Sequence, residues 1–104
     1  MPAYVIKESR QIAATPGMVV RELTFAPGEA TPWHRHSAMV DRRYGLAGVV
    51  TVESEDGPPV SLGPGEVCET PAGVRHRLVN AGTAEARALL VQYGGAYDFL
   101  VDDT

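Results

Sequence analysis

The sequence predicts an all-β fold of antiparallel strands, arranged as a sandwich, a barrel or a jelly roll. Short segments rich in β-branched and aromatic residues recur along the chain, and clusters of Gly, Pro and Asn separate them. Eleven glycines and eight prolines occur among the 104 residues, well above the usual share of about 12%. No stretch shows a sustained helical period. The length suits one domain, so residues 1–104 are expected to form a single unit.

The expected strands follow one another along the chain, with turn signals between most of them. The segment from Met18 to Phe25 is β-rich, and Leu23 and Phe25 alternate with Glu22 and Thr24. Further strands are expected at 4–7, 33–36, 41–46, 49–53, 66–70, 74–79 and 87–93. Turns are expected at 57–59 (GPP), 63–65 (GPG), 71–73 (PAG) and 80–82 (NAG).

Charge and composition exclude several classes of partner. The net charge is −4, and the eight arginines and one lysine are scattered, so no basic stripe for nucleic acid is expected. The longest apolar runs, such as 88–91, are far shorter than the roughly 20 residues that span a bilayer, so no membrane partner is expected. The first residues contain no apolar signal segment, which predicts a cytoplasmic protein. The one cysteine, Cys68, excludes an internal disulfide and a zinc site built on cysteines.

The three histidines are the main candidates for a functional site. His34 and His36 are two residues apart in an extended segment, so both point to one face, about 6.6 Å apart along the strand. Two imidazoles at this separation can converge on one metal ion, each at about 2.1 Å. His76 alternates with Arg75 and Arg77, and because arginines prefer water, its own face is expected to be the inner one.

Asp41 is the nearest carboxylate after the histidine pair. Nitrogen and oxygen ligands without a thiolate suit divalent Fe, Mn, Ni, Zn or Cu. Taken singly, each histidine is more often a surface or hydrogen-bonded residue, and Asp41 can simply begin a strand. Taken together, three inward imidazoles without a shared partner would each cost about 1–3 kcal/mol, and a bound metal removes that cost.

Two ordered motifs in the chain resemble those of the cupin superfamily. The first motif is G, five residues, H-x-H, three or four residues, E, six residues, G, and its positions are occupied here by Gly28, His34, His36, Asp41 and Gly48. The second motif is G, five residues, P-x-G, two residues, H, three residues, N, and it is matched in full by Gly65, Pro71, Gly73, His76 and Asn80. The 16 residues between them resemble the short spacer of small microbial single-domain cupins.

This resemblance implies a jelly-roll β-barrel with a metal ion inside it. The implied ligands are His34, His36, Asp41 and His76. Asp41 stands where the motif has Glu, and its side chain is one methylene shorter. It is therefore expected to bind the metal directly, to hold a metal-bound water, or to orient a histidine from outside the ligand shell. Cupin dioxygenases with three-histidine sites are known, so Fe or Mn is favoured.

Three further residues near this site carry expectations. If Asp41 points inward, Arg43 does too, where it would pair with Asp41 or Glu69 or act as a clamp for a substrate carboxylate or enolate. A bend after Asp41 would instead turn Arg43 outward. Glu69 is a candidate general acid or base if burial raises its pKa, and otherwise an exposed residue. Gly45 is expected to enlarge the cavity because it has no side chain.

The leading interpretation is a metal-dependent enzyme that acts on a small organic molecule. An Fe or Mn dioxygenase comes first, and a lyase, isomerase or decarboxylase that uses the metal as a Lewis acid comes second. A non-catalytic ligand-binding cupin and a purely structural metal remain alternatives. Small cupins often form homodimers through sheet edges, and open edges give this barrel a physical motive to do so, with residues 4–7 and 94–104 as candidate contact segments.

Overall fold

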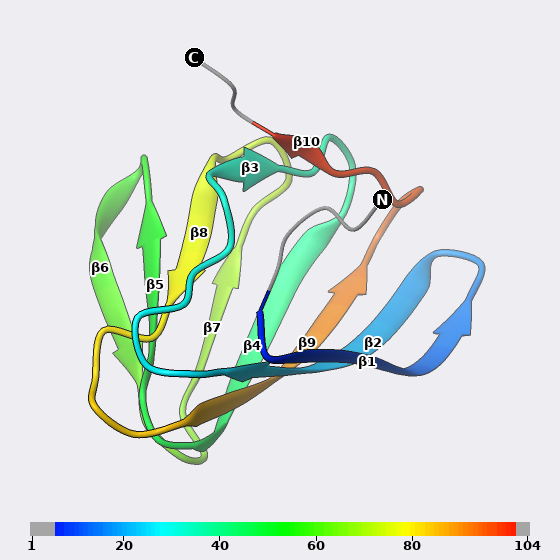
Figure 1. Cartoon of the computed structure of the whole chain (residues 1–104). Coiled ribbons are helices and arrows are strands. Elements are labelled where there is room, and N and C mark those ends of the chain that lie inside the picture. Colours follow the sequence, from blue (N-terminus) through cyan, green and yellow to red (C-terminus); the bar gives the residue numbers. More distant parts are fainter. Residues whose placement is uncertain (1–5, 102–104) are drawn as a thin grey trace.

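Two antiparallel sheets face each other and form the molecule (Figure 1). The computed structural model describes residues 6–101, and this part of the chain contains strands and turns but no helix, hence none that is long and apolar enough to cross a membrane. The strands are β1 (Glu8–Thr15), β2 (Met18–Phe25), β3 (His34–Arg35), β4 (Val40–Ala47), β5 (Val50–Ser54), β6 (Gly57–Leu62), β7 (Val67–Thr70), β8 (His76–Val79), β9 (Ala86–Tyr93) and β10 (Leu100–Val101).

Each sheet draws its strands from both halves of the chain. One five-stranded sheet has the order β1-β2-β9-β4-β7, and the other has the order β10-β3-β8-β5-β6. Every pairing between these strands is antiparallel. Most neighbours in a sheet are not consecutive in the chain, because the chain repeatedly crosses from one sheet to the other. The predicted all-β antiparallel jelly roll is confirmed.

Three strands of the structure were not predicted from the sequence. β6 begins at Gly57 and contains Pro58 and Pro59, where the sequence predicts a turn; the turn lies at residues 55–56 instead. Prolines are tolerated in β6 because it is an edge strand. β1 is exposed throughout and has no apolar alternation, and β10 has only two residues. Of the strand expected at 4–7, residues 4 and 5 lie outside the described residues, and residues 6 and 7 precede β1.

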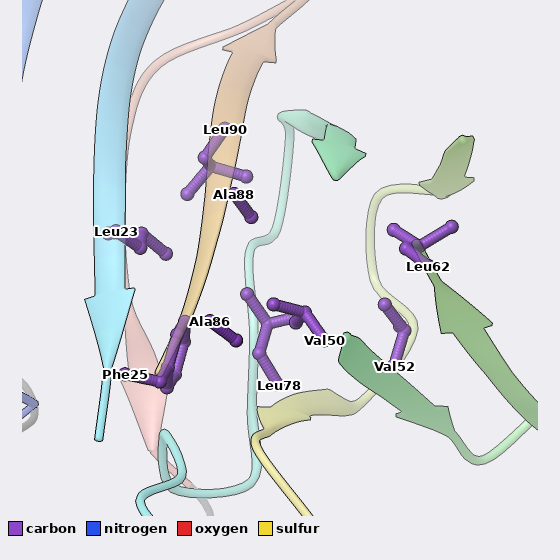
Figure 2. Packing of buried hydrophobic residues seen from close by; sticks show 9 residues of the cluster. All are labelled: Leu23, Phe25, Val50, Val52, Leu62, Leu78, Ala86, Ala88 and Leu90. Atoms are coloured by element: carbon purple, nitrogen blue, oxygen red, sulfur yellow. The ribbon is translucent and has the colours of Figure 1, made fainter. Parts of the chain in front are cut away.

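The space between the sheets is divided into an apolar part and a polar part. Figure 2 shows the apolar cluster, which draws on both sheets and consists of Leu23, Phe25, Val50, Val52, Leu62, Leu78, Ala86, Ala88 and Leu90. β9 passes through both parts. Its buried residues at positions 86, 88 and 90 are alanine and leucine and belong to the apolar part, whereas the next buried residue, Gln92, belongs to the polar part. The buried polar residues include the three histidines, Asp41 and Arg43. The apolar part therefore supports the fold, and the polar part is available for chemistry.

Gly45 lets two segments of backbone approach each other. A Cβ atom at this position would lie 2.1 Å from the carbonyl oxygen of Gly63. Hydrogen bonds fix the approach on both sides: the Gly45 N–H donates to the Glu66 carbonyl, and the Gly65 N–H donates to the Gly45 carbonyl, each at 2.8 Å. The expectation that Gly45 enlarges the cavity was wrong, because the place of its missing side chain is filled by the loop after β6.

We expect Gly45→Ala to destabilise the protein by about 1–3 kcal/mol or more, because neither backbone segment can move without breaking these hydrogen bonds. Urea unfolding curves measure the effect. Gly57→Ala is the matched control, because a Cβ atom at Gly57 meets nothing within 4 Å. Equal stabilities of the two variants would contradict the steric account.

The homodimer and the cytoplasmic location stay predictions. The edges that a dimer through strand pairing would use are β1 and β7 in one sheet and β10 and β6 in the other. The described part of the C-terminal segment pairs with its own chain, since β10 lies beside β3 (Figure 1).

Candidate metal centre

Four buried side chains from three strands and one loop meet between the two sheets. His34 lies in β3 and pairs with His76 of β8, so the two imidazoles share the inner face of one sheet. His36 follows β3 directly, and Asp41 lies in β4 of the opposite sheet. One ligand atom from each of these residues lies within 4.8 Å of those from the other three. The structure thus brings together all four residues that were predicted as metal ligands.

Each histidine is held by a hydrogen bond from its Nδ1 atom to a backbone carbonyl. The acceptors are Pro32 O at 2.7 Å for His34, Asp98 O at 2.5 Å for His36 and Val74 O at 2.9 Å for His76. A carbonyl oxygen only accepts, so the Nδ1 atom of each ring must carry a proton. In the neutral imidazoles the lone pair is therefore on Nε2, the nitrogen available to a metal ion.

Two of these Nε2 atoms contact the carboxylate of Asp41. The Oδ2 atom lies 3.2 Å from Nε2 of His36 and 3.0 Å from Nε2 of His76. A neutral imidazole nitrogen and an ionised carboxylate oxygen both present lone pairs, so the contacts are favourable only when a proton or a metal cation lies between them. Two ligands about 2.1 Å from one ion and at right angles are about 3.0 Å apart. The residues therefore fit a metal ion with nitrogen and oxygen ligands.

Burial and neighbouring charges shift the pKa values of the cluster residues in different directions. Burial lowers the pKa of His34 to about 3, so this ring is neutral at ordinary pH. Burial alone would raise the pKa of Asp41, but hydrogen bonds from His36 and His76 and the charge of Arg43 lower that pKa well below its usual range. Burial likewise opposes protonation of His36, but the nearby carboxylate of Asp41 raises the His36 pKa above its usual value. The cluster is thus a buried anion surrounded by imidazoles.

Asp41 is positioned by its neighbours in the sheet. The register places Gln92 of β9 and Thr70 of β7 directly beside it on the inner face. Gln92 Nε2 donates to Asp41 Oδ1 at 3.1 Å, and Arg43 Nη2 lies 3.3 Å from Asp41 Oδ2. Gln92 was not predicted as a site residue. The one sequence signal for it is the alternation along β9, which puts it on the face of Ala88 and Leu90.

Arg43 points inward and is completely buried. Its Nη1 atom donates to Thr70 Oγ1 at 2.6 Å, and its Nη2 atom pairs with Asp41. It is not among the residues that line the pocket at the metal cluster. Of the alternatives left open by the sequence, the structure therefore shows the inward arginine paired with Asp41. The expected clamp for a substrate anion has no geometric support, because the carboxylate of Asp41 occupies this guanidinium.

A pocket lined by aromatic side chains opens onto the cluster. Phe99 stacks on His34 with ring centroids 4.2 Å apart, and the Tyr97 ring lies 5.8 Å from that of His36. Both belong to the C-terminal segment that leads into β10. Asp98, between them, also accepts hydrogen bonds from Ser37 through its carboxylate. No sequence motif marks these residues, because only the folded chain brings the C-terminal segment beside β3.

The comparisons with known proteins agree with this geometry. The family model described as the cupin domain matches residues 21–92, which is more than half of the chain. The chain belongs to the cupin family. No curated protein matches the cupin by sequence.

Solved structures share the fold of this cupin. TT1209 from Thermus thermophilus superposes with a TM-score of 0.78 at 25% identity, over 86% of this chain and 84% of the other. A protein with a double-stranded beta-helix domain from Klebsiella pneumoniae gives 0.83 at 19% identity, over 100% and 90% of the two chains. KdgF from Halomonas sp. gives 0.75 at 22% identity, over 85% and 78%. These similarities support a small cupin barrel.

Glu69 lies away from the metal cluster of the cupin. Its side chain is 37% exposed and pairs with Arg42 Nη1 at 2.8 Å. The Tyr93 hydroxyl donates to the same carboxylate oxygen at 2.7 Å. Hydrogen bonds from Tyr93 and Arg42 lower the pKa of Glu69. Of the two alternatives left open by the sequence, the structure shows the exposed carboxylate with a lowered pKa, so the condition for Glu69 to act as a general acid or base is not met.

Proposed function

We propose that this cupin is a metal-dependent enzyme with one divalent transition metal ion held by His34, His36, His76 and Asp41. The observation that carries the proposal is that one ligand atom from each of the three histidines and from Asp41 lies within 4.8 Å of the others, while each Nδ1 atom is already hydrogen-bonded to a carbonyl. Nitrogen and oxygen donors without a thiolate suit Fe or Mn, which we favour, as well as Ni, Zn and Cu.

Within this class we favour a dioxygenase that acts on a small organic molecule. His34, His36, His76 and Asp41 would hold the ion, and the pocket that opens onto them would be the place where substrate and O₂ meet it. When bound, an iron or manganese ion supplies Lewis acidity and oxygen activation. The chain's own residues hold the ligands in place: backbone carbonyls orient the imidazoles, and Gln92 and Arg43 orient the carboxylate. Tyr97 and Phe99 line the pocket beside the cluster.

The pocket lining also bears on the second candidate, a lyase or isomerase that uses the metal as a Lewis acid. Such reactions commonly need a side chain that removes a proton from carbon. Once the four cluster residues are assigned as ligands, the described residues of the lining include no further carboxylate or imidazole. Tyr97 lines the same pocket, and its phenol is the candidate acid or base for such a reaction. The experiment must distinguish the proposed dioxygenase from two alternatives. One is a lyase, isomerase or decarboxylase, and the other is a non-catalytic ligand-binding cupin.

The experiment combines metal analysis with oxygen uptake. Untagged protein is expected to contain about one equivalent of metal after reconstitution, measured by elemental analysis. The Fe- or Mn-loaded protein is expected to consume O₂ with a diketone, a phenol or a keto acid, in proportion to the substrate lost. Zn-loaded protein is the control, because Zn has no redox chemistry. Failure to bind any transition metal would refute the metal centre, and metal binding without O₂ uptake would refute the dioxygenase alone.

A further inference from the structure

One arginine in the pocket has no role in the metal cluster. Arg21 lies in β2 on the same face as Leu23 and Phe25, because side chains of a strand alternate. Its cross-strand partner on this inner face is Leu90 of β9. Arg21 is half-buried and lines the pocket together with the four cluster residues. A cation is thus placed on the inner wall beside the metal cluster.

Arg21 differs from most arginines of the protein in its contacts. Six others form ion pairs with carboxylates, at positions 10, 42, 43, 75, 77 and 87. Among the described residues, Arg21 forms no hydrogen bond or ion pair, and its guanidinium lies 6.0 Å from the centre of the Tyr97 ring. A guanidinium offers two parallel N–H donors that match a carboxylate. Because these donors are unpaired in Arg21, its guanidinium provides a binding site for an anion in the pocket.

A second polar group of the pocket also lacks a partner. Gln92 is 2% exposed, and its Nε2 atom donates to Asp41. Its Oε1 atom is buried and accepts no hydrogen bond from any described residue. A buried amide oxygen is normally satisfied by a donor from protein, water or ligand. Arg21 is thus an unpaired cation on the lining itself, whereas Gln92 Oε1 has almost no accessible surface and is reached by a ligand only after neighbouring side chains move.

We propose that the pocket binds a small hydroxycarboxylic acid, with its carboxylate on Arg21 and its hydroxyl donating to Gln92 Oε1. This inference rests on the proposed function, since the acid would be the substrate class of the metal centre. The free space of the pocket is about 10 Å³, room for about one water molecule, so the acid would enter only when the Tyr97 side chain, which is 44% exposed, moves aside. Neither contact requires the metal ion, so the binding can be measured with and without it.

The test is calorimetric titration of metal-free and Zn-loaded protein with lactate, lactamide and propionate. Lactamide removes the charge of the carboxylate, and propionate removes the hydroxyl. We expect lactate to bind at least about 10-fold more tightly than lactamide, and more tightly than propionate. Arg21→Gln should weaken lactate binding on the order of 10- to 100-fold and leave the affinity for lactamide and the metal content unchanged. Arg21→Lys, which keeps the charge without the two parallel donors, should lie between.

Arg35→Gln is the matched control. It removes the same charge from β3, but Arg35 is exposed and does not line the pocket. Lactate affinity within twofold of wild type in Arg21→Gln would overturn the inference, and so would the absence of lactate binding or equal binding of lactate and lactamide. The metal content of the same samples reports separately on the metal centre. If the protein binds metal normally but does not bind lactate, only the inference about Arg21 is overturned. If the protein binds lactate through Arg21 but holds no metal, only the proposed function is overturned.

Discussion

His76→Ala is expected to lower the affinity for the metal ion at least about 100-fold. Even residues that only orient a ligand contribute about 10- to 100-fold to metal affinity, and His76 supplies an Nε2 atom directly beside the carboxylate of Asp41. At a metal concentration about 100 times the Kd, binding stabilises the wild-type protein by about 2.7 kcal/mol. The variant should show no such gain. Elemental analysis and thermal unfolding with and without metal measure both effects.

Arg77→Ala is the control for damage to β8. Arg77 neighbours His76, but its side chain points outward and pairs with Glu53. This control should bind metal as the wild type does. His76→Gln provides a second variant if the alanine variant folds poorly, because the amide keeps much of the volume of the ring. Normal metal content in both His76 variants would show that His76 is not a ligand.

Asp41→Ala is expected to destabilise the metal-free protein by about 3–5 kcal/mol. Arg43 is completely buried, and its positively charged guanidinium pairs with Asp41. Without Asp41, its charge would remain buried with only a hydroxyl partner, Thr70. Removal of one member of a buried ion pair typically costs this much. Urea unfolding in the presence of a chelator measures the loss.

A double-mutant cycle tests the cause of this loss. Asp41→Ala combined with Arg43→Met removes both charges and should recover most of the stability, because buried ion pairs can be replaced by apolar side chains at little cost. Glu53→Ala is the comparison, since its pair with Arg77 is partly exposed and should contribute about 0–1 kcal/mol. A double variant no more stable than Asp41→Ala would contradict the explanation.

The metal cluster could be predicted from the sequence because its signals are local. His34 and His36 share a face through their spacing alone, and the arginines beside His76 indicate which face is outward. The bounds of β2 were predicted correctly for a similar reason, since its alternation is strong and turn signals bracket it. Asp41 lies at the motif position of Glu and contacts the histidines although its side chain is shorter. The register of β4 brings its carboxylate within reach of two imidazoles.

What the sequence did not reveal depends on contacts between distant segments. Gln92 becomes a partner of Asp41 only through the register of β9 with β4. Arg43 was recognised as an inward candidate, but the choice between Asp41 and a substrate as its partner needed coordinates. Gly45 was misinterpreted because the loop that approaches it begins 18 positions further along, at Gly63. Patterns along one strand do not reveal what lies against that strand.

The two prolines of β6 affect how copies of the barrel meet. Successive residues of an antiparallel strand direct their N–H groups to opposite sides, so one of Pro58 and Pro59 removes a donor from the free side of β6. β1, the other long edge, has a register irregularity between Gln11 and Ala13, and irregularities of this kind hinder the addition of a further strand. The remaining edges, β7 and β10, have four and two residues. The molecule is thus guarded against unlimited strand-by-strand aggregation, and a specific pairing of two copies would depend on side-chain contacts between sheet faces.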